Sequence, residues 1–254
     1  MKKTTLARIL VSLAAAGLVG IAGVPAANAA SSGGAGTCTG GDVSGTFSNL
    51  TIAGYCTVPQ GATLNVTGNL TVDPGAALDA QTYSSTVIVG KNVTAGAGSL
   101  LGLGCQSPES VGNTAHPCLD GGNSVVSIGG NVTATGAMGV LLNGITVKGN
   151  VTVTGGGADF PWSIKNNTIG GNVTMSGQTT NWIGVLFNKI GGNATFTNIV
   201  ITDTDPGGNG MYIGHNAVGR NLNCSGITPK VSPGFGPVPN TVGGKATGQC
   251  AALV

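Results

Sequence analysis

Carboxylates are the first candidates for catalysis, because hydrolysis of a glycosidic bond needs two of them at a set separation. The chain has eight Asp and Glu residues, and Asp203 and Asp205 are the only pair close in sequence. His215 follows them and adds a third group capable of acid–base work. Pro206 and two glycines place the pair in a turn, where Asp is common for conformational reasons alone. We therefore predict no catalytic residues and keep Asp203, Asp205 and His215 as the alternative set.

Aromatic residues offer a second kind of chemistry, the stacking of a sugar ring on an exposed π face. Trp182 and Tyr212 fall at outward positions of neighbouring repeats. By register, the side chains nearest to them are Lys165, Phe187 and His215. The predicted ligand-binding residues are Trp182, Tyr212, Lys165 and His215. The competing interpretation is that the rings only cover a bend of the backbone.

The six cysteines indicate disulfides and not a metal site. The chain has no CxxC motif, no histidine cluster and no dense acidic cluster, so we predict no metal and no cofactor. Cysteines of an exported chain pair with one another, and we favour the pairing of neighbours in sequence. The predicted bridges are Cys38–Cys56, Cys105–Cys118 and Cys224–Cys250. The first and last would hold the two ends of the fold, and the middle one would close a loop.

The elements that position these residues come from one repeated phrase, Asn-[Val/Leu]-Thr. Its copies start at Asn49, Asn69, Asn92, Asn131, Asn150 and Asn172, with variants at Asn193 and Asn221. The steps of 20, 23, 39, 19, 22, 21 and 28 residues indicate the stacked rungs of a β-solenoid. We interpret the step of 39 as two rungs with one degenerate copy between them. Positions 1 and 3 after Asn are apolar and positions 2 and 4 are small and polar, which is typical of a strand with one inner face.

A second strand precedes each copy, with inner residues that include Val140, Trp162 and Ile183. A turn of the form Asn-x-[Ile/Val]-Gly-[Gly/Arg]-Asn then leads into the next copy, as at Asn167–Asn172. We expect Asn amides of successive rungs to hydrogen-bond as a ladder. Parallel crossovers are right-handed. The predicted fold is therefore all-β, a right-handed parallel β-helix with rungs of about 20 residues.

Threonines form a column at positions 2 and 4 of the repeat, as at Thr133 and Thr135. Rows of Thr on a flat solenoid face can present ordered hydroxyls to ice, yet Thr is also a favourable residue on any exposed strand. The column is interrupted at Asp73 and Gly96. Ice binding is accordingly a minor alternative.

Residues 1–29 have the features of a secretory signal peptide. A basic start with Lys2, Lys3 and Arg8 precedes an apolar stretch, and a small-residue cleavage site follows at positions 27–29. Without these three residues, seven basic side chains face eight acidic ones, so the formal charge of +2 becomes −1. We predict a secreted, extracellular protein with no membrane span, and the lack of clustered positive charge excludes nucleic-acid binding. A flexible segment over 30–45 would precede one β-helix domain over 46–254.

The rungs, and above all the stretch from Asn216 to Pro229 (NAVGRNLNCSGITP), resemble the secreted right-handed β-helix proteins of actinobacteria. The resemblance covers roughly Asn49 to Cys250 and implies the fold and export, but no catalytic residues. More distantly, the architecture is similar to that of pectate lyases and polygalacturonases. Thr202-Asp203 and Gly214-His215-Asn216 match parts of the polygalacturonase pattern, whereas its Asp-Asp pair and its Arg-Ile-Lys element are missing.

These observations favour an exported, non-enzymatic β-helix protein at the cell surface or in the extracellular matrix. Its rigid, weakly charged faces would contact polysaccharide or protein. The alternative is a carbohydrate-active enzyme of the polygalacturonase or lyase kind that uses Asp203, Asp205 and His215. The sequence makes no prediction of oligomeric state.

Overall fold

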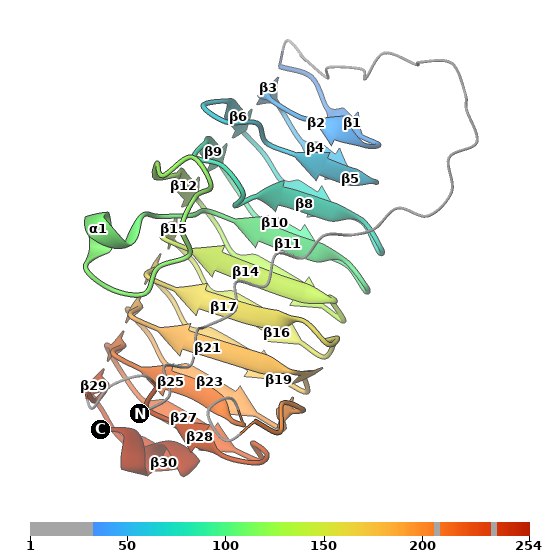
Figure 1. Cartoon of the computed structure of the whole chain (residues 1–254). Helices are drawn as coiled ribbons and strands as arrows, with labels where there is room; N and C mark the ends of the chain where they lie inside the picture. The colour runs from blue at the N-terminus through green and yellow to red at the C-terminus, as the bar shows by residue number, and fades with distance from the viewer. Residues whose placement is uncertain (1–32, 206–208, 235–237) are drawn as a thin grey trace, which may run out of the picture.

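The computed structural model describes residues 33–205, 209–234 and 238–254, and the predicted signal peptide lies outside these residues. Within them the chain winds as a stack of rungs, each built from three short strands (Figure 1). Strands of successive rungs pair in parallel to form three long sheets. The protein is a parallel β-helix, as the repeat predicts.

Sheet 1 has ten strands, most of which follow the Asn of the repeated phrase. They are β1 (Gly36–Cys38), β4 (Leu50–Ile52), β7 (Leu70–Val72), β10 (Val93–Ala95), β13 (Val132–Thr135), β16 (Val151–Thr154), β19 (Val173–Ser176), β23 (Ala194–Thr197), β27 (Leu222–Ser225) and β30 (Ala246–Gly248). Sheet 2 has nine strands and corresponds to the second strand predicted for each rung. They are β2 (Gly41–Asp42), β5 (Tyr55–Thr57), β8 (Ala77–Ala80), β11 (Leu100–Leu103), β14 (Gly139–Asn143), β17 (Pro161–Lys165), β21 (Trp182–Leu186), β25 (Met211–Gly214) and β28 (Val231–Ser232).

Sheet 3 also has nine strands and occupies the segment for which the sequence predicts only a turn. They are β3 (Gly45–Phe47), β6 (Thr63–Val66), β9 (Thr86–Val89), β12 (Val125–Ile128), β15 (Ile145–Val147), β18 (Thr168–Ile169), β22 (Lys189–Ile190), β26 (Ala217–Val218) and β29 (Thr241–Val242). The prediction of a turn is therefore wrong. Within the Asn-x-[Ile/Val]-Gly motif lies a two-residue strand whose Ile or Val points inward. Two residues are too few to show the alternation of apolar and polar side chains that identifies a strand in sequence. A further pair, β20 (Thr179–Thr180) and β24 (Val200–Ile201), lies outside these sheets.

The apolar bore follows the predicted pattern. Val132, Val151 and Val173 are paired in register along sheet 1, and all three are fully buried. Trp162 is also fully buried, as its inward position predicts. One rung contains too little apolar surface to be stable alone, so stacking of these columns is what stabilises the fold.

The step of 39 residues is one rung and not two. β10 pairs directly with β13, Val93 opposite Val132, so no degenerate copy lies between them. The extra residues form an insertion over 104–124 between β11 and β12, which contains the short helix α1 (Pro108–Val111). Figure 1 shows this segment, the 104–124 loop, projecting from the side of the solenoid. The period alone cannot separate an insertion from a second rung, because the two add similar numbers of residues.

The boundary of the domain also differs from the prediction. β1 and β2 lie within residues 36–42 and pair with the next rung, so part of the segment predicted to be flexible belongs to the solenoid. At the other end, the 3₁₀ helix η1 (Gln249–Leu253) covers the last rung, with Cys250 and Leu253 buried. The disulfides form as predicted, at Cys38–Cys56, Cys105–Cys118 and Cys224–Cys250.

Two asparagine ladders connect the rungs. The first runs along the start of sheet 1, where each Asn Oδ1 accepts a hydrogen bond from the backbone N–H of the next Asn, as from Asn172 to Asn150 at 2.8 Å. The second lies at the corner between sheets 2 and 3 and is buried. It consists of Asn167, Asn188, Asn216 and Asn240. The sequence predicts the first ladder, whereas the second lies in the segment interpreted as a turn.

Candidate functional site

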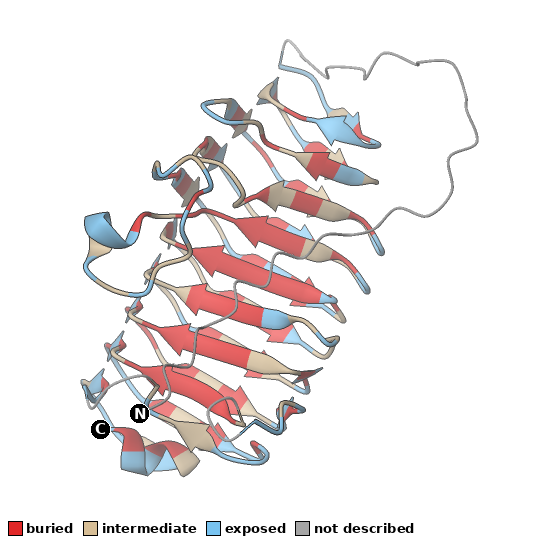
Figure 2. Ribbon diagram, viewed as in Figure 1, coloured by how far each residue is buried: buried red, intermediate tan, exposed pale blue. Residues whose placement is uncertain are grey.

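The outer face of sheet 2 differs from that of sheet 1. The residues of β13 and β16 alternate between buried and accessible, as expected for a strand with one face to solvent. All five residues of β14 and all four of β25 are buried, and Figure 2 shows the buried class running along β14, β17 and β21. Both faces of sheet 2 are therefore covered in this region, and the 104–124 loop supplies part of the cover.

The 104–124 loop is fixed to the solenoid by several polar contacts. The Cys105–Cys118 disulfide closes it. The amides of Asn113 and Asn166 donate to each other's Oδ1 atoms at 2.7 and 3.0 Å, which joins the loop to the end of β17. The backbone N–H of Leu119 donates to the carbonyl of Thr82 at 2.9 Å. These contacts fix the loop against sheet 2, so the side chains of the loop are held at defined positions.

A groove of about 830 Å³ lies between the 104–124 loop and sheet 2. The side chains that line it include His116 and Leu119 from the loop and Leu141, Phe160, Lys165 and Trp182 from the rungs. The volume is within the range of about 300–1,000 Å³ typical of small-molecule sites, and the lining is largely apolar with a few polar groups. We refer to this feature as the groove.

Trp182 is the large aromatic residue of the groove. It begins β21, and its six-membered ring occupies the space above Gly184, where a Cβ would collide with it. The ring of Tyr212 on the next rung lies 5.6 Å from that of Trp182, with 32° between their planes. Lys165 Nζ lies 5.4 Å from the Trp182 ring centroid, a cation–π distance. Trp182, Tyr212 and Lys165 are therefore brought together, as the register predicts.

The electrostatics of the groove are set by burial. Burial lowers the pKa of the Lys165 ammonium below its usual value. Burial also lowers the pKa of the His116 imidazole, the charge of Lys165 lowers it further, and Asp79 acts in the opposite direction. Burial, with a smaller contribution from Asp203, raises the pKa of the Tyr212 hydroxyl. Lys165 is the one lysine or arginine among the residues that line the groove, and its surroundings favour the neutral form of His116.

Two polar atoms beside the groove have no partner. Gln81 lines the groove, and its Oε1 is buried without a hydrogen bond within the described residues. Asn143 Nδ2 is also buried without a hydrogen bond within the described residues, whereas Asn143 Oδ1 accepts a hydrogen bond from Ser163 Oγ at 2.8 Å. Buried polar groups are almost always paired, so such atoms mark places where a ligand or water can bind.

His215 does not line the groove. Its ring stacks on that of Phe187, with 4.3 Å between centroids, and both line a smaller hollow of about 250 Å³ beside residues 112–114 of the loop. Both residues have positive φ angles, 59° for Phe187 and 58° for His215, in the region that bulky side chains rarely adopt. The corner of the rung thus turns their side chains outward as a pair.

Asp203 and Asp205 line neither the groove nor the smaller hollow. Asp203 Oδ1 accepts a hydrogen bond from the backbone N–H of Asp205 at 2.9 Å, the geometry of an Asx turn. Asp203 lines a hollow of about 380 Å³ with Thr202 and Pro229, and His215 does not line it. The three residues of the alternative catalytic set therefore do not share a hollow.

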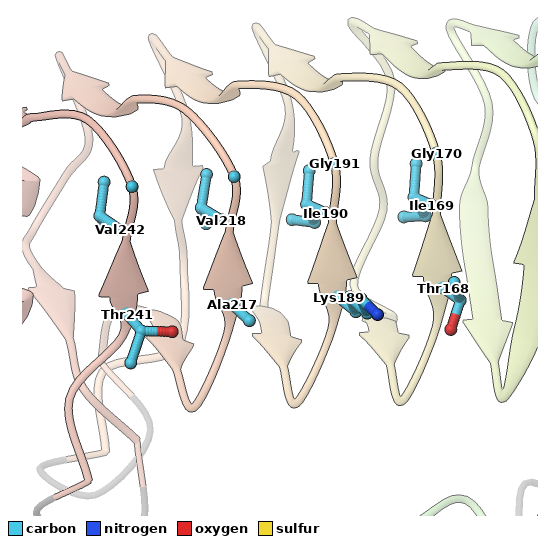
Figure 3. Close-up of a pocket in the computed structure, with 12 residues that line it drawn as sticks. Thr168, Ile169, Gly170, Lys189, Ile190, Gly191, Ala217, Val218, Thr241 and Val242 are labelled. Atoms are coloured by element: carbon cyan, nitrogen blue, oxygen red, sulfur yellow. The ribbon is translucent and has the colours of Figure 1, made fainter.

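Two other surfaces carry regular columns. On sheet 1, Thr133, Thr152, Thr174 and Thr195 are paired in register on the outer face. On sheet 3, a shallow trough of about 520 Å³ crosses four rungs. Figure 3 shows Ile169, Ile190, Val218 and Val242 in one row of this trough and Thr168, Lys189, Ala217 and Thr241 in a second row.

The sequence predicted that Cys105–Cys118 closes a loop, but it did not predict that this loop covers sheet 2 or that His116 and Gln81 line a groove there. The available signal was the step of 39 residues together with the Cys105–Cys118 pair inside it, which is the pattern of a disulfide-closed insertion. Within the described residues no group of three His, Cys, Asp or Glu side chains could hold a metal ion. A search of the same residues for a helix long and apolar enough to cross a membrane found none. No family model matches the sequence, and neither a curated protein nor a solved structure matches the chain.

Proposed function

We propose that this protein is an exported glycan-binding protein and that the groove is its binding site. The observation that carries the proposal is the position of Trp182, an accessible aromatic ring beside a cation in a concave, loop-walled site. Sugar rings bind to such sites by placing their C–H face on the aromatic ring and their hydroxyls on nearby polar groups. Three disulfides suit an extracellular location, since such bonds persist in oxidising compartments.

The proposal does not include cleavage of the glycan. A hydrolase of the polygalacturonase kind needs two carboxylates about 5–10 Å apart across one site. Asp203 and Asp205 form a turn outside the groove, and His215 lines a different hollow. We expect no release of reducing ends from pectin, alginate, hyaluronan or xylan.

The experiment that tests binding is a glycan array on the purified protein, followed by calorimetric titration of the strongest binder. Trp182→Ala should abolish binding, because it removes the stacking surface, whereas Trp182→Phe should retain part of the affinity. His215→Ala should leave it unchanged, because His215 lies outside the groove. Unchanged affinity of Trp182→Ala would contradict the proposed site, and full loss in His215→Ala would move the site to the smaller hollow.

Ice binding is a second candidate, supported by the in-register threonines of sheet 1. The hydroxyls of neighbouring rungs come close enough to interact, as between Thr94 and Thr71 at 3.3 Å. Thr152→Tyr would break the flat surface without touching the core. If ice binding is the function, the native protein shows thermal hysteresis and this variant does not.

A further inference from the structure

Lys165 is a half-buried lysine that lines the groove. Its Nζ contacts the carbonyl oxygen of Thr114 at 3.5 Å and the face of Trp182 at 5.4 Å. Among the described residues no carboxylate forms an ion pair with it. A half-buried ammonium whose contacts are one long hydrogen bond to a carbonyl and one aromatic face is well placed to bind an anion that enters the groove.

Asp79, the carboxylate that acts on His116, is already hydrogen-bonded to other donors. Asp79 accepts hydrogen bonds from the backbone N–H groups of Gln81 and Thr82 at 3.1 and 3.0 Å. It also accepts one from the Thr82 hydroxyl at 2.6 Å and one from the Tyr55 hydroxyl at 3.3 Å. These donors hold Asp79 in place at the end of β8, and Lys165 remains free to bind an anion from outside the chain.

We propose that the groove selects glycans that carry a carboxylate, and that Lys165 binds this group. This inference rests on the proposed glycan-binding function and specifies its ligand. Two contacts of different chemistry then belong to one ligand. Trp182 meets the ring face, and Lys165 donates charge-assisted hydrogen bonds to the carboxylate.

A lysine ammonium is a point charge and attracts a sulfate as well as a carboxylate. We favour the carboxylate because Lys165 is the one lysine or arginine that lines the groove, and a heavily sulfated chain is bound by several cations. A uronic acid supplies one negative charge on a ring with hydroxyls and a C–H face. The experiment therefore compares carboxylated, sulfated and neutral glycans.

The ligand side of the test is an array that contains all three classes. The strongest carboxylated binder is then titrated beside its methyl ester, which keeps the ring and loses the charge. The acid should bind about ten- to hundredfold more tightly than the ester, the effect of one charge-assisted contact. Equal affinity for acid and ester, or stronger binding of sulfated or neutral glycans, would overturn the inference while the proposed function stands. Binding to no glycan of any class would overturn both.

The protein side of the test uses Lys165→Met, which keeps the length of the side chain and removes the charge. Its affinity for the acid should fall about ten- to hundredfold, and its affinity for the ester should not change. Its Tm should change little, because the ammonium is only half-buried and its contact with Thr114 is exposed to solvent. Lys189→Met is the matched control, an exposed lysine of sheet 3 outside the groove, and should change neither quantity. A lower Tm for Lys165→Met with unchanged affinity for the acid would show that Lys165 has a structural role only.

Discussion

The two asparagine ladders use the same side chain in the same stack of rungs, yet their surroundings differ. In the ladder at the start of sheet 1, which is accessible to solvent, Asn172 Nδ2 donates only to Asn150 Oδ1, at 3.2 Å. In the buried ladder, Asn188 Nδ2 donates both to Asn216 Oδ1 at 2.9 Å and to the carbonyl of Ile164 at 2.8 Å. The buried amides are thus paired fully within the protein, and the accessible ones leave part of their capacity to water.

The ladders also run in opposite directions. In the accessible ladder the backbone N–H of Asn172 donates to the preceding rung, at Asn150. In the buried ladder the backbone N–H of Asn167 donates to the following rung, at Asn188. At the C-terminal end, η1 completes the buried ladder, because Asn240 Nδ2 donates to the carbonyl of Leu253 at 2.9 Å. The comparison predicts that burial, and not the amide alone, decides how much an asparagine contributes to stability.

Asn188→Ala should have the largest effect. It removes the acceptor of the Asn167 backbone N–H and the donor to the Ile164 carbonyl, both in a buried site. We expect a loss of about 3 kcal/mol or more in the free energy of unfolding, since each buried unpaired group costs about 1–3 kcal/mol. Chemical denaturation of this variant beside the native protein measures it. A loss well under about 1 kcal/mol would mean that water enters and replaces the amide.

Gly171→Ala should have the next largest effect, through the accessible ladder. A Cβ at this position meets Asn150 Oδ1 and the carbonyl of Gly149, so the strand has to shift. Overpacking of this kind costs about 1–3 kcal/mol. The glycine before each Asn would then matter more to this ladder than the amide that follows it. Chemical denaturation of Gly171→Ala beside the native protein measures this loss of stability. An unchanged midpoint would show that the ladder adjusts without strain.

Asn172→Ala should have a smaller effect than either of these. Its Oδ1 accepts the backbone N–H of Asn193 at 2.8 Å, but that donor is close to solvent. We expect a loss of about 0.5–1.5 kcal/mol, the net value of one ordinary hydrogen bond, because water can take the place of the amide. The ladder forms as the sequence predicts, but Asn172 is exposed, so its loss leaves no buried group unpaired. A loss equal to that of Asn188→Ala would remove the distinction between the two ladders.

A change of pH should have the smallest effect on stability. It should act through His116 in the groove and through neither asparagine ladder. Amides do not titrate, so both ladder variants should lose the same stability at every pH. The pKa of His116 is lowered in the fold, so the unfolded chain takes up its proton first as the pH falls. Stability is therefore complete above the unfolded pKa of about 6.5 and declines as the pH falls toward the lower folded value. Thermal unfolding across this window should show the decline in the native protein and less of it in His116→Gln. An identical decline in both would assign it to other groups.

The affinity for a glycan should also depend on the protonation of His116. It should increase as the pH falls, whereas stability decreases. Protonated His116 adds a second positive charge beside Lys165, so the affinity for a carboxylated glycan should increase as the pH falls through the lowered pKa of His116 in the folded protein. Calorimetric titration across that range with the native protein and His116→Gln would measure the difference. Asp79 faces the same imidazole and reduces the size of this effect.

Much of the fold was predictable from the sequence, because each rung repeats the same local pattern. The period of the Asn phrase indicates a solenoid, and the alternation after each Asn identifies the inner residues Val132, Val151 and Val173. The disulfides were predictable because each pair is close in sequence: Cys38–Cys56 and Cys224–Cys250 lie at the two ends of the stack, and Cys105–Cys118 closes a loop. The cluster of Trp182, Tyr212 and Lys165 followed from register alone.

The tertiary structure decided the rest. Only the pairing of Val93 with Val132 shows that residues 104–124 are an insertion, because sequence length does not distinguish a loop from a rung. A segment outside the repeat has no register, so the position of His116 over Lys165 could not be derived from it. Asn172 and Asn188 are the same residue type on neighbouring rungs, and the path of the backbone at each corner determines which of them is buried. Periodicity fixes which side chains share a column, but packing from outside the repeat determines which columns meet water and which form a site.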